Sequence, residues 1–453
     1  MGQTSPGMRY TSLWIIGLIL ILGSVLPAWP QSVALQPVKF PASATELALG
    51  DPSGRFAAPG YFRTAPVPLD FSYYAAREGR PQAPGTVVDD FLVLPRVDVS
   101  EVYNDNIFAQ PGHAKSDETT VIAPSIGATS LWGTHAASLS ASLQQGLYSR
   151  FSSEDYTDGR VLAEGRYDID GANALSGGAL FERGHEPRGS PNDARGSEPT
   201  RFDLFQARTA YTGHLGRASA DLELRFDDYT YLEVPSPSGP IDTGILDRTA
   251  FMPRLRLGYA LVPQTTQLFV QTRFRDTVYT QLVGGIDRDS HNYQHVAGIE
   301  LTPGGPLSGQ IFGGITQQEF VSTHIQSFVA PAYGASLTWT PTLLTTVRAE
   351  TGYTIEDAAF DGSSGYRQTA VDVAVDHELL RSVLLNASIF RAERTYIGQG
   401  RHDVFTELNA GARYAVTNAI SIGPSVSFAQ RDANFADTNF DQVVALVRLT
   451  GKL

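Results

Sequence analysis

The sequence contains no cysteine among its 453 residues and only 3 methionines. The absence of cysteine excludes disulfide bonds, thiolate nucleophiles and cysteine-ligated zinc. Cations are also scarce, because 34 Lys and Arg against 47 Asp and Glu leave a net charge of −13, which argues against a nucleic-acid partner. The chain does have 43 Gly, 19 Tyr and 23 Phe, a balance typical of many strands joined by tight turns.

Long apolar runs are missing except near the N-terminus. Arg9 precedes an apolar run over residues 13–23, and small residues such as Ala28 and Ala34 follow. This three-part pattern predicts a signal peptide over residues 1–34. The alternative is an uncleaved anchor, although the run is shorter than the roughly 20 residues that a spanning helix needs. Residues 35–90 are rich in proline with little periodicity, which predicts a loosely structured extension.

Residues 91–453 repeat one unit, an alternating segment of roughly ten to fourteen residues followed by a turn. Short connections such as 132–135, 214–217 and 340–343 alternate with long polar ones such as 185–200. Counting these segments predicts an all-β, up-and-down antiparallel transmembrane β-barrel of about eighteen strands, an even number as in bacterial single-chain outer-membrane barrels.

Charged residues occupy one face of the predicted strands. Asp221 and Glu223 oppose Leu222 and Leu224, for example. A soluble sandwich also alternates, but a wet lumen tolerates this many charges where a packed core does not. The predicted lumen and selectivity residues are Asp221, Glu223, Arg225, Arg254, Arg256, Arg273, Arg275, Arg348, Glu350, Asp372, Glu407 and Arg413. Opposed rows of acid and arginine filter solutes by charge; alternatively, they pair and only brace the wall.

Aromatic residues recur on the apolar face close to the short turns. Amphipathic rings at one height are typical of the girdle where a barrel meets the membrane interface. The predicted interface residues are Trp132, Tyr167, Tyr211, Tyr259, Trp339 and Tyr414.

Residues 97–108, VDVSEVYNDNIF, begin as an alternating strand and then reach Asn104, Asp105 and Asn106, which are poor strand formers. We expect the first barrel strand to leave the wall here through an Asx turn. A calcium site is the alternative, since Asp105, Asp117 and Glu118 carry hard oxygen ligands, but the spacing matches no EF-hand loop.

The segment 99–108 resembles the first-strand motif of the putative beta-barrel porin 2 family, outer-membrane proteins of Gram-negative bacteria, some encoded beside exopolysaccharide genes. The resemblance implies an outer-membrane barrel from about residue 91 onward and implies no catalytic residue. The extension 35–90 would then lie in the periplasm, as a linker or a plug.

No G-x-S-x-G, HExxH, P-loop or GxGxxG motif occurs, and the 9 histidines are scattered, so we predict no enzymatic activity, cofactor or metal. The expected function is an outer-membrane pore for small hydrophilic solutes or for exopolysaccharide. The alternative is a plugged structural or adhesive barrel. The expected partners are outer-membrane lipids, lipopolysaccharide and the barrel assembly machinery, while the oligomeric state stays open.

Overall fold

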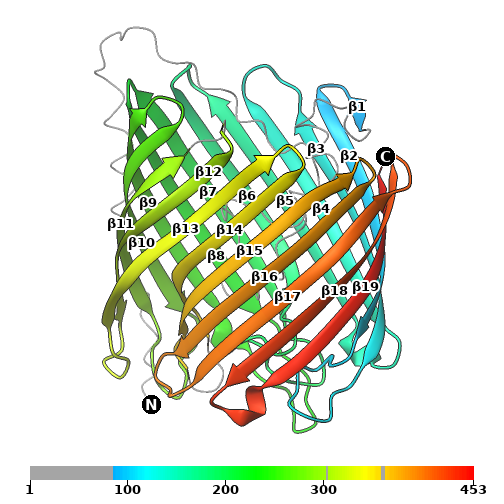
Figure 1. The fold of residues 1–453 in the computed structure, drawn as a ribbon. Helices are drawn as coiled ribbons and strands as arrows, with labels where there is room; N and C mark the ends of the chain where they lie inside the picture. Colours follow the sequence, from blue (N-terminus) through cyan, green and yellow to red (C-terminus); the bar gives the residue numbers. More distant parts are fainter. Residues whose placement is uncertain (1–84, 302–304, 359–362, 453) are drawn as a thin grey trace.

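The computed structural model describes residues 85–301, 305–358 and 363–452. The predicted signal peptide and almost all of the predicted extension lie outside the described residues. Eighteen long strands form one closed antiparallel barrel, as the alternation predicts (Figure 1). The barrel strands are β2 (Phe91–Asn104), β3 (Asp117–Ser130), β4 (Ala136–Tyr148), β5 (Tyr156–Asp168), β6 (Asn173–His185), β7 (Arg201–Leu215), β8 (Ala218–Tyr231), β9 (Arg248–Val262), β10 (Thr266–Tyr279), β11 (Ser290–Leu301), β12 (Leu307–Phe320), β13 (Phe328–Thr342), β14 (Thr345–Glu356), β15 (Tyr366–Leu380), β16 (Val383–Tyr396), β17 (His402–Ala415), β18 (Ile420–Ala433) and β19 (Phe440–Lys452).

The barrel closes where the last strand pairs with the first. β19 runs antiparallel to β2, with Val444 opposite Asn104 and Lys452 opposite Arg96. Closure leaves the wall without an unpaired edge, so the ladder hydrogen bonds are satisfied around the ring. A short strand, β1 (Thr86–Val88), forms a hairpin with the start of β2.

The connections follow the predicted alternation of short and long. Gly216 and Arg217 join β7 to β8, and Gly216 adopts a φ of 60°, which a glycine tolerates without strain. The short turns gather at the end of the barrel where β19 finishes, and the long connections gather at the other end (Figure 1). Because outer-membrane barrels have short periplasmic turns, we assign the long-loop end to the cell exterior.

The long connections contain three single-turn 3₁₀ helices within the described residues, η2 (Ser152–Glu154), η3 (Gly244–Leu246) and η5 (Ala436–Thr438). No helix in the described part of the chain is both long and apolar enough to span a membrane.

Side chains alternate across the wall with the period of two that a strand imposes. Most outward positions are apolar and exposed, as at Leu222, Leu257 and Val270. Inward positions are polar, charged or packed under loops, so the described part of the chain forms no continuous hydrophobic core. Clusters of buried apolar side chains instead line parts of the inner wall, and one of them contains Leu180, Phe202 and Leu204.

Candidate functional site: the lumen wall and an inward-folded loop

The first strand leaves the wall as the sequence predicts. The backbone N–H of Asn106 donates to Asn104 Oδ1 at 2.9 Å, which confirms the Asx turn. Asn106 itself is only 2% exposed, and its side chain donates to the carbonyl oxygens of Gln110 at 3.0 Å and Asp441 at 2.9 Å. The motif residue Asn106 therefore fastens the loop 105–116 to β19.

The acids considered as calcium ligands have other partners. Asp105 accepts a hydrogen bond from the Val443 amide at 2.7 Å. Asp117 accepts from the amides of Arg150 and Phe151 at 3.1 and 3.0 Å. Within the described ranges, no group of three or more His, Asp or Glu side chains is arranged to hold a metal ion.

Acids and arginines of β8 and β9 meet on the inner wall. Arg254 donates to Asp221 at 2.8 Å and to Glu223 at 3.3 Å. Arg256 pairs with Glu300 on β11 and donates to Gln310 on β12 at 3.0 Å. The structure thus brings together the predicted charges of adjacent strands, and it adds Glu300, which the sequence analysis did not select.

A second group of charges connects the wall to a loop. Arg248 Nε donates to Asp357 Oδ2 at 3.0 Å, and Arg275 Nη2 donates to the same oxygen at 2.5 Å. Burial acts to raise the pKa of Asp357, but Arg275 and Arg248, together with hydrogen bonds from Tyr279 and Arg275, hold that pKa well below its usual range. Asp357 therefore carries a negative charge that anchors the end of β14 to β9 and β10.

The remaining predicted lumen charges lie elsewhere on the wall. Arg225 pairs with Asp227 two residues along β8 at 2.8 Å. Arg348 pairs with Asp376 at 2.9 Å. Glu350, which stands opposite Asp372 in the β14–β15 ladder, accepts a hydrogen bond from Ser336 at 3.3 Å. Glu407 and Arg413 share the inward face of β17. Most of these groups have partners, which agrees with bracing of the wall.

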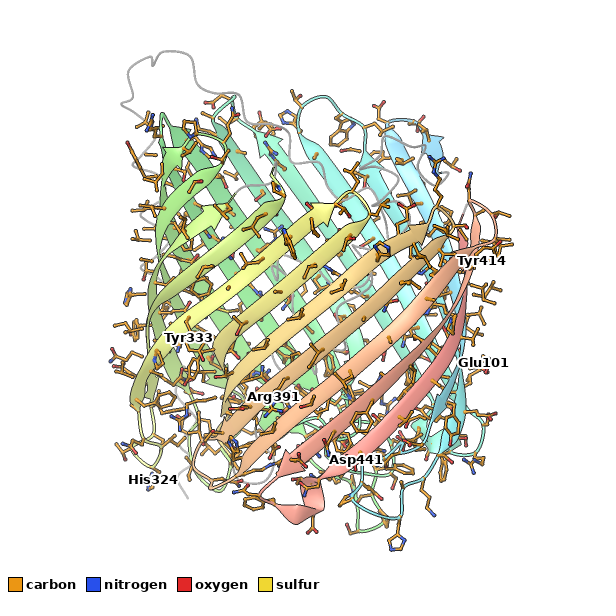
Figure 2. The ribbon with its side chains drawn as sticks, in the orientation of Figure 1. Glu101, His324, Tyr333, Arg391, Tyr414 and Asp441 are labelled. Carbon is orange, nitrogen blue, oxygen red and sulfur yellow. The ribbon has the colours of Figure 1, made fainter. Side chains whose placement is uncertain are left out.

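Five of the predicted interface aromatics lie on the outer face of their strands, and Trp132 lies in the turn between β3 and β4. Their exposed fractions run from 38% at Tyr211 to 60% at Tyr167. Figure 2 labels Tyr414 toward the short-turn end, with Tyr333 and then Asp441 progressively closer to the long-loop end. Their role at a membrane interface stays a prediction.

One long connection folds into the lumen instead of projecting outward. In the loop 186–200, the Gly189 carbonyl accepts a hydrogen bond from Arg431, which faces inward on β18. A Cβ at Gly189 would lie 2.8 Å from Ala109 Cβ and 3.2 Å from the ring of Phe440. The loop starts between β6 and β7 and reaches side chains of the β18–β19 wall, so it crosses the interior and narrows it.

Buried ionic contacts hold this inward-folded loop. Arg188 donates to both carboxylate oxygens of Glu154, at 2.7 and 2.6 Å, and lies 3.3 Å from Asp193. Its guanidinium also lies 5.9 Å from the ring centroid of Phe108. Arg188 therefore ties the loop 186–200 to the β4–β5 connection.

Glu186 anchors the start of the same loop. Its carboxylate accepts hydrogen bonds from Ser190 at 2.9 Å and from Tyr231 on β8 at 3.0 Å, and the residue is 5% exposed. Burial raises the pKa of Glu186, although the two hydrogen bonds and the positive charge of Arg248 act against this rise. The sequence analysis missed this loop, and its only signal was the density of charge over residues 185–200.

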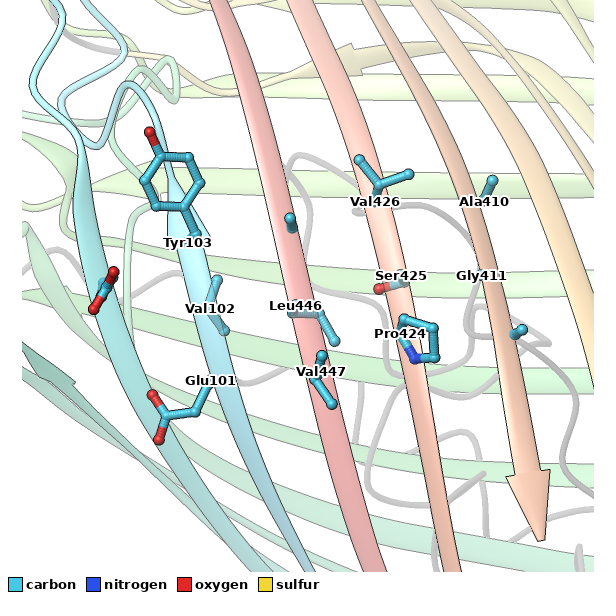
Figure 3. Close-up of a pocket in the computed structure, with 13 residues that line it drawn as sticks. Glu101, Val102, Tyr103, Ala410, Gly411, Pro424, Ser425, Val426, Leu446 and Val447 are labelled. Carbon is cyan, nitrogen blue, oxygen red and sulfur yellow. The ribbon is translucent and has the colours of Figure 1, made fainter.

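A groove of about 780 Å³ lies on the outer face of the wall and not in the lumen (Figure 3). It runs over β17, β18, β19 and β2, and small side chains such as Ala410, Ala412 and Ala445 line it. At its edge, the Thr120 hydroxyl contacts both oxygens of the outward-facing Glu101 at 3.0 and 3.1 Å. This groove is separate from the charged inner wall.

The comparison with protein families identifies the fold. The model of the putative beta-barrel porin 2 family matches residues 80–453, which includes all eighteen barrel strands. The chain belongs to this family. As a porin 2 family barrel, the protein is located in the outer membrane, and the resemblance of the segment 99–108 is confirmed.

Solved structures show a similar architecture at low sequence identity. A BenF-like porin from Pseudomonas fluorescens Pf-5 is 9% identical with a TM-score of 0.44, and the match covers 81% of this chain and 100% of that one. OpdK from Pseudomonas aeruginosa, solved with vanillate, is 11% identical with a TM-score of 0.42, covering 80% and 99%. The siderophore receptor PirA from Pseudomonas aeruginosa is 7% identical with a TM-score of 0.41, covering 80% of both chains. Likenesses this distant say nothing about what the porin 2 family barrel transports. No curated protein matches the sequence.

Proposed function

We propose that this barrel is a pore for passive diffusion of small hydrophilic solutes. The observation that carries the proposal is the combination of a closed wall with a charged inner face and a loop that crosses the interior. An inner face bearing Asp221, Arg254 and Arg256 suits water and polar solutes better than a packed core. The inward-folded loop favours small solutes over exopolysaccharide, because it narrows the path that a polymer would need.

Diffusion assays on the full chain test this proposal. Reconstituted in planar bilayers, the protein should give steady steps of conductance. Liposomes that contain it should swell in solutions of small sugars, and the swelling rate should fall as the molecular mass of the sugar increases. Equal permeation by short and long polymers would favour the exopolysaccharide conduit. A correctly folded barrel without conductance or swelling would overturn the pore and favour a structural or adhesive role.

A further inference from the structure

One inward-facing arginine differs from the others. On the described strands, the other inward-facing arginines have a hydrogen bond or an ion pair, and Arg413 has a polar, ring or electrostatic interaction. Arg273, in the middle of β10, has neither within the described residues, and its Nε is buried without a hydrogen-bond partner. Arg273 as a whole is half-buried on the inner face of β10.

Two arginines flank Arg273 on the inner wall. Arg254 stands opposite it in the β9–β10 ladder, and Arg275 follows it on the same inner face of β10. The charges of Arg275, Arg225 and Arg254 act against its positive charge, and the charge of Glu356 acts in its favour. No hydrogen bond joins Arg273 to Glu356, whose Oε2 atom also lacks a partner.

Apart from Glu356, the acids near these arginines are already engaged. Asp221 and Glu223 bind Arg254, and Asp357 binds Arg275. On the other side of Arg273, the half-buried Gln294 of β11 stands opposite it in the ladder and can supply an amide donor. No carboxylate of the described residues forms a hydrogen bond or an ion pair with Arg273 at this position. A buried donor without a hydrogen-bond partner lowers the stability of the fold, and a bound ligand with an acceptor oxygen would remove this penalty.

We propose that Arg273 is an anion-binding site in the lumen, which takes the carboxylate or phosphate group of a permeating solute. The proposal rests on the pore function and names the class of solute that the pore favours. A guanidinium presents a planar fork of N–H donors that matches two oxygens of a carboxylate or phosphate. Because Arg254 and Arg275 are paired with acids, Arg273 supplies the one positive charge of this group that no acid of the described residues pairs with, and this charge attracts an anion.

Two measurements test the site with defined anions. In planar bilayers, inorganic phosphate and acetate are each added to a chloride background, and the reduction of chloride current gives an apparent affinity. Isothermal titration of the detergent-solubilised full chain with the same two anions gives a binding constant that does not depend on conduction. The variants are Arg273→Gln, which removes the charge, and Arg273→Lys, which keeps it without the fork. The matched control is Arg391→Gln, because Arg391 faces outward on β16 (Figure 2).

We expect Arg273→Gln to weaken phosphate or acetate binding about ten- to hundredfold, as loss of hydrogen bonds to a charged group predicts. Arg273→Lys should retain intermediate affinity, and Arg391→Gln should match the wild type. An effect with acetate alone identifies a carboxylate site, and an effect with phosphate alone identifies a phosphate site. Equal affinities in Arg273→Gln and wild type, or no binding of either anion, overturn the anion site even if the pore conducts. Binding that depends on Arg273 in a silent channel supports the site and counts against the pore. If Arg273→Gln does not fold, the anion affinities of Arg273→Lys and the wild type are compared instead. Equal affinities overturn the proposal that the guanidinium of Arg273 binds the anion through its fork of N–H donors.

Discussion

The ion pair between Arg188 and Glu154 tests whether the loop 186–200 is held inside the barrel. Both side chains are buried, with exposed fractions of 9% for Arg188 and 2% for Glu154. Two charge-assisted hydrogen bonds join them, at 2.7 and 2.6 Å. Replacing Arg188 by Ala leaves the Glu154 carboxylate buried without its cation. The chain can relieve this by moving the loop outward, so that water reaches the carboxylate.

The size of the effect follows from the burial of the pair. Removing one partner of a buried ion pair costs roughly 3–5 kcal/mol. Since each 1.4 kcal/mol is about a factor of ten in an equilibrium constant, the outward population of the loop should rise about a hundredfold to several thousandfold. Loss of the 3.3 Å contact between Arg188 and Asp193 acts in the same direction.

The absence of cysteine from the sequence makes this population measurable. Asn192 is 2% exposed, so a cysteine in its place reacts with a membrane-impermeant maleimide only when the loop moves outward. The labelling rate of Asn192→Cys then reports the outward population, and Arg188→Ala in this background should accelerate it by the factor above. Arg195→Ala is the matched control, because Arg195 lies on the same loop but is exposed.

An unchanged labelling rate in Arg188→Ala would refute the claim that this pair holds the loop. A second refutation comes from the double variant with Glu154→Gln. If the effects of Arg188→Ala and Glu154→Gln simply add, the two side chains do not act together. Retention of the folded form on unheated gels shows that the barrel itself is intact in each variant.

Two further predictions concern pH and the first-strand motif. Because burial raises the pKa of Glu186, its ionised form disfavours the inward loop at neutral pH. This penalty decreases as the pH falls through the raised pKa and is gone below the ordinary pKa of a glutamate. Acidification should therefore slow the labelling of Asn192→Cys relative to the labelling of a cysteine at the exposed Ser238. Glu186→Gln should abolish this pH dependence. Faster relative labelling in acid would contradict the prediction. Asn106→Ala removes the side-chain hydrogen bonds to Gln110 and Asp441 and should lower the free energy of unfolding by about 2–3 kcal/mol in urea titrations. Asn104→Ala removes one hydrogen bond and should lower it by about 1 kcal/mol. Equal losses in the two variants would be evidence against the anchoring role of Asn106.

The wall could be predicted because its signals are local. A period of two fixes which side chains face inward, and short turns such as 214–217 fix that consecutive strands are neighbours. It follows that Asp221 and Arg254 share the inner face of adjacent strands, as the structure shows. The pairing of Arg256 with Glu300 skips β10, and no local pattern specifies a contact between strands that are not adjacent.

The inward-folded loop could not be predicted because its partners are distant in sequence. Gly189 contacts Arg431 across 242 positions, and Arg188 contacts Glu154 across 34. Neither contact produces a periodic pattern in the sequence. A charged stretch between two strands predicts a solvated loop. Asp357 was missed for the same reason. Its cations, Arg248 and Arg275, lie on β9 and β10, and several strands of the barrel wall separate them from the end of β14.

The distribution of ion pairs assigns different consequences to neighbouring arginines. Arg275 and Arg273 are two residues apart on the same face of β10, but Arg275 is neutralised by Asp357 and Arg273 has no partner in the described residues. A substitution at Arg275 therefore releases Asp357 and loosens the end of β14, which changes the shape of the interior. A substitution at Arg273 breaks no hydrogen bond or ion pair among the described residues and mainly changes the potential that a solute meets. Selectivity for anions should consequently depend on Arg273, and the integrity of the narrowed end should depend on Arg275 and Arg188.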